Sequence, residues 1–191
     1  MKNLYFITFY SLLILFIGCS EERIQNDIQE NNQSKASENT YQTDLIAGQN
    51  TDSGNIIVSV IDGNLNVTYE TEGDWVILEV HLFVGDPDDL PVNNGGNPKI
   101  GQFPYSESYS PGETSVTFNN IIEIPSGESV WIAAHAVVLN TVTGQEETAW
   151  AAGVPINSGG NGNGGNGNGN GGSWAMWFEV SNNGGGGGGQ F

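Results

Sequence analysis

Beyond about residue 44, apolar and polar side chains alternate in short runs separated by Gly, Pro, Asn and Asp. In residues 65–70 every second side chain is large and apolar, and the side chains between them are Asn, Thr and Glu. This alternation predicts a β-strand with one buried face and one solvated face. Residues 55–61 form a second β-rich run, and Asp62-Gly63 stands between the two runs as a typical hairpin turn. The pattern therefore predicts a β-hairpin over residues 55–70.

Several later runs are also rich in β-branched and aromatic residues. They predict strands at residues 75–84, 115–119, 130–139, 147–151 and 174–180. No window of useful length has the 3.6-residue period of an amphipathic helix. Short strands with turn-rich connections predict an all-β domain, a single antiparallel β-sandwich (jelly-roll or immunoglobulin-like) over residues 44–181.

Two of these strands are apolar on both faces, which is typical of central strands that are covered on both sides. Simple alternation divides each strand into two rows of side chains. In residues 130–139 one row contains Trp131 and His135, and the opposite row is entirely Val, Ile and Ala. In residues 75–84 one face is predicted to carry Val76, Leu78, Val80, Leu82 and Val84, and the other Trp75, Ile77, Glu79, His81 and Phe83.

Low-complexity segments flank and interrupt the predicted domain. Residues 158–173 are almost entirely Gly and Asn, so we expect a flexible, solvated loop inserted before the last core strand. Residues 182–191 repeat the glycine-rich composition and predict a disordered tail. Residues 19–43 are rich in Asn, Gln, Glu and Ser, and this stretch predicts a disordered tether after a cysteine.

The first eighteen residues predict a secretory signal peptide, because Lys2 precedes an apolar run that is too short to span a membrane. The run ends in Phe16-Ile17-Gly18-Cys19, which resembles a bacterial lipobox, with Phe16 where Leu is commoner. The resemblance implies cleavage before Cys19 and attachment of lipid to its thiol. Ser20, Glu21 and Glu22 are similar to the acidic export signal of Bacteroidota lipoproteins. That similarity implies a protein lipid-anchored in the outer membrane, and it favours exposure at the cell surface over the periplasmic face.

The domain itself resembles a recurrent all-β module of secreted and anchored bacterial proteins. The resemblance covers residues 44–181 and rests on the segments 45–49, 96–105, 133–138, 147–150 and 174–178. The module has no assigned activity, so the resemblance implies domain limits and location rather than chemistry.

Charge restricts the possible partners. The chain of 191 residues has 22 acidic and 4 basic side chains, and its formal net charge is −18. Such a chain repels the phosphates of nucleic acids and anionic lipid headgroups. We expect a membrane partner through the lipid anchor, with a glycan or a surface protein as further candidates. Cys19 is the single cysteine, so no disulfide is expected.

A metal site is one candidate for the chemistry of the domain. Glu79 and His81 share a strand face, and His135 lies on the other doubly apolar strand. If the two strands are neighbours, two imidazoles and a carboxylate could bind Zn²⁺ or a similar cation. The alternative, which we favour, is a buried polar cluster that satisfies its own hydrogen bonds and fixes the strand register. No cofactor is expected.

Two further candidates compete with simpler explanations. The acidic residues 86–89 could begin a calcium loop, but a solvated acidic turn explains them better. Trp177 and Glu179 face away from the predicted core and could form a sugar-binding surface, whereas the other tryptophans are explained by packing.

No nucleophile elbow, zinc-protease helix or phosphate-binding glycine loop is found in the sequence. We therefore expect a surface lipoprotein with a non-catalytic binding or envelope-structural module, and not an enzyme. A carbohydrate- or divalent-metal-binding module is the alternative, and a small glycan-active enzyme is the third possibility.

Overall fold

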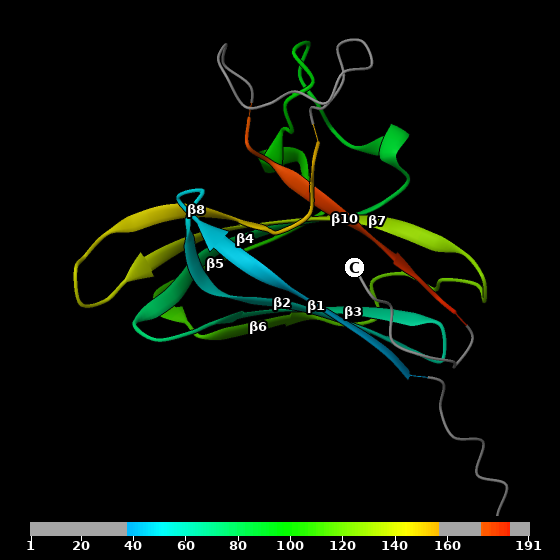
Figure 1. Ribbon diagram of the computed structural model, residues 1–191, viewed down its shortest axis with the longest axis horizontal. Coiled ribbons are helices and arrows are strands. Elements are labelled where there is room, and N and C mark those ends of the chain that lie inside the picture. Colours follow the sequence, from blue (N-terminus) through cyan, green and yellow to red (C-terminus); the bar gives the residue numbers. More distant parts are fainter. Residues whose placement is uncertain (1–37, 157–172, 184–191) are drawn as a thin grey trace, which may run out of the picture. The chain divides into compact units, whose positions relative to one another are not determined.

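The computed structural model describes residues 38–156 and 173–183, which consist mostly of antiparallel strands (Figure 1). The expected all-β fold is confirmed. The strands are β1 (Glu38–Ala47), β2 (Thr51–Ile61), β3 (Asn64–Thr71), β4 (Trp75–Gly85), β5 (Tyr105–Glu113), β6 (Ser115–Phe118), β7 (Ser129–Asn140), β8 (Glu146–Ala151), β9 (Val154–Pro155) and β10 (Met176–Ser181). Two 3₁₀ turns, η1 (Pro87–Asp89) and η2 (Ile100–Gln102), lie between β4 and β5.

The strands form one continuous sheet in the order β5-β4-β7-β8-β1-β2-β3-β6. β10 pairs with residues 129–132 of β7, whereas β8 pairs with residues 135–139 of the same strand. β10 also pairs with the short β9. Only Thr114 separates β5 from β6, and its carbonyl accepts a hydrogen bond of 3.0 Å from the amide of Thr71 at the end of β3. The two ends of the strand order are thus two parts of one bent strand. The sheet is therefore closer to a barrel than to two separate sheets.

The hairpin β2–β3 has the turn that its sequence predicts. Ile61 pairs with Asn64, and the two residues between them, Asp62 and Gly63, have φ values of 50° and 84°. Positive φ at both central positions gives the turn a twist that matches the twist of the flanking strands. Leu65, Val67 and Tyr69 are fully buried, so the predicted inner face of β3 is confirmed.

The main core lies inside the curled sheet and includes inward-facing residues from most strands. Leu45, Val58, Val67, Ala136 and Val180 are among its fully buried members. Phe178 and Val180 bring β10 into this core, as the sequence predicts.

A β-bulge at Leu78 changes the predicted faces of β4. Ile77 pairs with Val138 and Glu79 pairs with Val137, so Leu78 is an extra residue in β4. The bulge reverses the alternation before it, which places Ile77 in the main core and Trp75 against it. The prediction that Val76 and Leu78 share a face with Val80, Leu82 and Val84 is therefore wrong, whereas the shared face of Val80, Leu82 and Val84 is confirmed.

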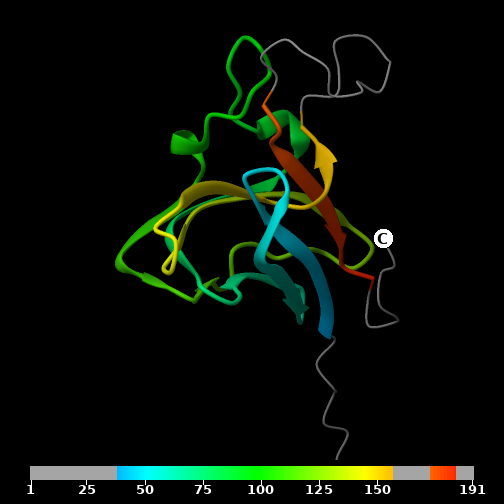
Figure 2. The ribbon, with the colours of Figure 1, turned by 60° about the vertical axis from the view of Figure 1, so that its left-hand side comes forward.

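A second, smaller core covers the outer face of β4, β7 and β8. The segment between β4 and β5 crosses this face beside the start of β10, as Figures 1 and 2 show in green and orange. The second core consists of Phe83, Leu90, Phe103, Ala133, Trp150 and Ala175. It explains why the two central strands are apolar on both faces.

Both predicted domain limits need correction. β1 begins at Glu38, and Tyr41 in its middle is 7% exposed, so the prediction of a disordered tether is wrong for residues 38–43. At the other end, the predicted tail begins at Asn182, yet Asn182 is buried and donates a 2.7 Å hydrogen bond to the carbonyl oxygen of Ile124. The predictions for residues 1–37, 157–172 and 184–191 lie outside the described residues.

Within the described ranges, no helix is both long and apolar enough to span a membrane.

Candidate functional site

The two histidines of the chain are neighbours on adjacent strands. His81 of β4 pairs directly with His135 of β7, and His135 pairs with Trp150 of β8. The centroids of the two imidazole rings are 5.5 Å apart, and the centroid of His135 is 4.9 Å from that of Trp150. The side chains of His81, His135 and Trp150 lie on the outer face of β4, β7 and β8, which the second core covers. The two strands are therefore neighbours, which is the condition under which the sequence allows the two histidines to converge.

Burial controls the protonation of His135. Burial, and then the charge of the neighbouring His81, lowers the pKa of His135 to about 3. His135 is therefore neutral at physiological pH. The Nδ1 atoms of both histidines are buried and have no hydrogen-bond partner in the part of the chain that the structure describes.

Glu79, the third predicted ligand, contacts His81. Its Oε1 atom lies 3.3 Å from Nε2 of His81, and its side chain is 41% exposed whereas that of His81 is 10% exposed. Among residues 38–156 and 173–183, no group of three His, Cys, Asp or Glu side chains is arranged to hold a metal ion. The arrangement is a mostly buried cluster with one solvent-facing carboxylate, but its two Nδ1 atoms show that within the described residues it does not satisfy all of its own hydrogen bonds. Metal binding by Glu79, His81 and His135 stays the less favoured hypothesis.

Trp177 packs against a second tryptophan on the outer surface of β7 and β10. The ring centroids of Trp131 and Trp177 are 4.8 Å apart and their planes are tilted by 47°. Both rings are half-buried. Glu179 pairs in register with Trp131, is exposed, and accepts a hydrogen bond from the hydroxyl of Ser129. The structure thus places both predicted sugar-binding residues on one face, and it adds Trp131 to them.

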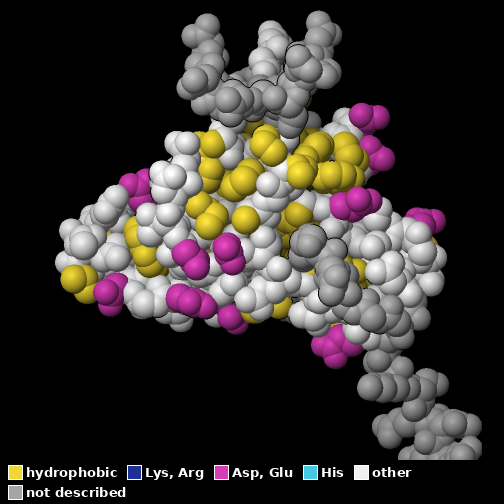
Figure 3. Space-filling view, in the orientation of Figure 1, with side chains coloured by type: hydrophobic (Ala, Val, Ile, Leu, Met, Phe, Trp, Pro, Cys, Tyr) yellow, Lys and Arg dark blue, Asp and Glu magenta, His cyan; other side chains and the backbone are white. Residues whose placement is uncertain are grey.

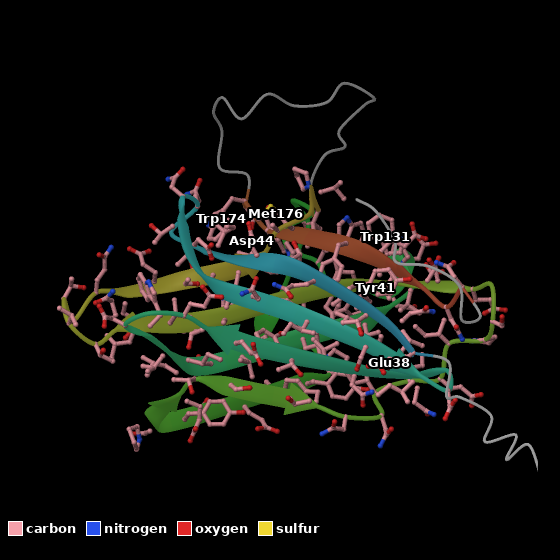
Figure 4. All side chains as sticks on the ribbon, turned by 60° about the horizontal axis from the view of Figure 1, so that its bottom comes forward. Glu38, Tyr41, Asp44, Trp131, Trp174 and Met176 are labelled. Carbon is pink, nitrogen blue, oxygen red and sulfur yellow. The ribbon has the colours of Figure 1, made fainter. Side chains whose placement is uncertain are left out.

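Trp177 is not part of the main core, but it packs against the second core. Trp174 and Met176 pack against the second core, as do Ile100 and Ile156. Figure 3 shows apolar side chains gathered on this part of the surface, with Asp and Glu around them. Figure 4 shows Trp131, Trp174 and Met176 along β7 and β10, and Glu38, Tyr41 and Asp44 along β1.

The acidic segment 86–89 forms a short capped turn. Asp86 is the N-cap of η1, and its carboxylate accepts a 2.9 Å hydrogen bond from the amide of Asp88. Asp86, Asp88 and Asp89 are exposed to solvent. The turn has the character of the solvated acidic turn that the sequence analysis favours over a calcium loop.

The outer face of β2, β3 and β6 contains a polar depression that the sequence analysis does not single out. The volume of this depression is about 480 Å³. In Figure 4 these strands lie in front, below β1. The side chains that line the depression are mostly amides and hydroxyls: Ser59, Asn64, Asn66, Thr68, Thr117, Asn119 and Asn120. The aliphatic Ile61 and the acidic Asp62 complete the lining.

Strand register brings these side chains together. Ser59 pairs with Asn66, and Thr68 pairs with Thr117. The hydroxyls of Thr68 and Thr117 are 2.9 Å apart and hydrogen-bonded, and Oδ1 of Asn66 accepts a 2.9 Å hydrogen bond from the amide of Asn120. In the sequence, the polar face of residues 65–70 is the one feature that points to this depression. The pattern does not show which strands lie beside that face.

No protein family, no curated protein and no solved structure matches the chain.

Proposed function

We propose that the chain is a surface lipoprotein of the outer membrane, anchored through Cys19, whose β domain is a non-catalytic binding or envelope-structural module. In finer terms we describe the domain as a β-sandwich, jelly-roll or immunoglobulin-like, whose two layers continue into each other. The resemblance of residues 16–19 to a lipobox and of residues 20–22 to an export signal supports the location.

One observation carries the binding function. The two outer faces of the curled sheet differ. The second core covers the outer face of β4, β7 and β8. The outer face of β2, β3 and β6 has a solvent-facing polar depression. A face with this many hydrogen-bonding groups on a rigid sheet is suited to recognition, because the strands hold the groups in place.

The location is tested with Cys19→Ser and with a double change of Glu21 and Glu22 to Ala. Cys19→Ser should abolish incorporation of labelled fatty acid and release the protein from membranes, because multiple acyl chains are needed for stable anchoring. The double variant should keep the lipid label but become resistant to protease added to intact cells. The wild-type protein should be degraded in the same assay.

Two results would contradict this location. Membrane partitioning that survives Cys19→Ser would argue for a different anchor. Equal protease sensitivity of the wild type and the Glu21, Glu22 double variant would remove the role of the export signal.

The Trp131–Trp177 pair favours a second candidate, a carbohydrate-binding module. Half-buried indole rings present apolar faces on which sugar rings can pack, and the carboxylate of Glu179 can accept hydrogen bonds from sugar hydroxyls. Trp177→Ala should then abolish binding of an oligosaccharide, as measured by titration calorimetry. Unchanged binding would exclude this pair as the site.

A further inference from the structure

We propose that the polar depression on β2, β3 and β6 is a binding site for an uncharged oligosaccharide. This inference names a ligand class for the binding function proposed above and rests on it. It places the site on the face opposite the second core, away from Trp131 and Trp177.

The chemistry of the lining favours a ligand with many hydroxyl groups. Asn, Ser and Thr side chains each combine donor and acceptor capacity, as sugar hydroxyls do. The Thr68–Thr117 pair uses the proton of one hydroxyl and leaves that of the other available. Nδ2 of Asn66 has a hydrogen-bond contact of 3.4 Å to the carbonyl of Asn64, at the long limit for such a bond. Among the contacts of the described residues, the lining therefore retains donor capacity that a ligand can use.

An apolar element in the same lining completes the fit. Ile61 is exposed (39%), as several other large aliphatic side chains of the described residues are, and it borders the depression. A sugar ring combines apolar C–H faces with hydroxyls at its edge, so Ile61 can contact a ring face while the amides and hydroxyls bind the edge. The volume of about 480 Å³ lies in the usual range of small-ligand sites, about 300–1,000 Å³.

Charge selects against acidic sugars and other anions. The lining has one ionisable side chain, Asp62, and it is negative. Lys99 is the single Lys or Arg residue in the described ranges, and it lies between β4 and β5 rather than at this face. An anionic ligand would therefore meet net repulsion with no counter-charge in the lining.

The test measures binding of neutral oligosaccharides to the full chain in mild detergent. The probes are hexasaccharides of the cello, xylo, manno and malto series, with an oligogalacturonate as the anionic comparison. The key variant changes Thr68 and Thr117 together to Val, which preserves side-chain shape and strand propensity and leaves neither hydroxyl of the pair without its partner. Thr148→Val, at an exposed position of β8, is the matched control, and Trp177→Ala reports on the other face.

We expect at least one neutral probe to bind the wild type and the oligogalacturonate not to bind. The double Val variant should weaken binding about tenfold, as expected for the loss of one or two hydrogen bonds, with its far-UV circular dichroism and melting temperature unchanged. Thr148→Val should bind like the wild type, and Trp177→Ala shows whether the face of β7 and β10 contributes to binding.

Three results would overturn the inference. They are binding of none of the neutral probes, binding that Trp177→Ala removes and the double Val variant retains, and equal binding of the anionic probe. The second of these results would preserve the proposed binding function and move its site to β7 and β10. The location experiments on Cys19 and the export signal are independent of all three.

Discussion

At the scale of single residues, His135 links the stability of the domain to pH. Its folded-state pKa is lowered to about 3, whereas an exposed histidine in the unfolded chain has a pKa of about 6.5. Between these two values the unfolded chain binds more protons than the folded domain. The contribution of His135 is therefore fully present above about pH 6.5 and is lost as the pH falls toward 3.

We expect acidification from pH 6.5 to pH 4 to lower the free energy of unfolding through His135 by roughly 1 kcal/mol per pH unit. Urea unfolding across this range measures the effect in the wild type and in His135→Phe, which keeps an aromatic ring and removes the titration. The difference between the two proteins isolates His135 from the titrating carboxylates. Parallel pH profiles would show that His135 is not the cause.

The candidate residues differ in how far the sequence could identify them. Alternation within two doubly apolar strands places His81 and His135 on matching faces, and the structure pairs them. The Trp131–Trp177 contact and the side of the polar depression that β6 provides depend instead on register between strands that are distant in sequence. Composition and periodicity of one strand carry no information on that register, so only the hairpin side of the depression could be predicted.

At the scale of elements, a close backbone approach fixes β9 and β10 together. β9 pairs with β10 through Val154 and Trp177, and a Cβ atom at Gly153 would lie 2.2 Å from the carbonyl oxygen of Trp177. Gly153 itself is exposed to solvent. A position that looks tolerant by exposure is therefore sterically restricted.

We expect Gly153→Ala to destabilise the domain by about 2 kcal/mol, because the backbone of β9 or β10 must shift to admit the methyl group. The melting temperature should fall by about 4–8 °C. Gly101→Ala is the matched control, since a Cβ atom there meets no atom within 4 Å and the backbone conformation is ordinary for Ala. Equal melting temperatures for both variants would show that β9 does not pack on β10 as described.

The strands that the sequence revealed are those with a clear apolar row, β2, β3, β4, β7, β8 and β10 among them. β5 was missed because its sequence, Tyr105–Glu113, is largely Ser, Glu, Pro and Gly and its side chains are mostly exposed. Pairing with β4 provides its backbone hydrogen bonds, which leave no mark in side-chain periodicity. The bulge at Leu78 was missed for a different reason. In a strand that is apolar on both faces, one inserted residue does not change the hydrophobic pattern.

At the scale of the whole molecule, closure of the strand order explains how a domain without disulfides buries its core. Strand β5 continues through Thr114 into β6, so the strand order returns to its starting point. This arrangement leaves few open edges in that part of the sheet, which limits edge-to-edge association. The sequence supports an all-β domain, but the closure depends on one corner residue that no local pattern distinguishes.

The same closed domain concentrates negative charge, and this charge should make its stability depend on salt. The chain has a formal net charge of −18, and self-repulsion of this kind destabilises a compact state more than an unfolded one. At about 10 mM salt the screening length is about 30 Å, so charges across the whole domain interact, whereas at about 150 mM it is about 8 Å. Raising NaCl across this range should therefore increase the melting temperature by about 3–8 °C, which corresponds to about 1–2 kcal/mol.

Differential scanning calorimetry in NaCl, MgCl₂ and CaCl₂ at matched ionic strength separates general screening from a specific cation site. Screening predicts that the two divalent salts act alike, because neither cation then has a preferred ligand set. A larger increase with CaCl₂ that Asp86→Asn removes would instead revive the calcium loop at residues 86–89, since binding to the folded state alone raises the melting temperature with ligand concentration. A melting temperature that falls as NaCl rises would contradict the repulsion argument, and would mean that attractive charge contacts outweigh the excess of 22 acidic over 4 basic side chains.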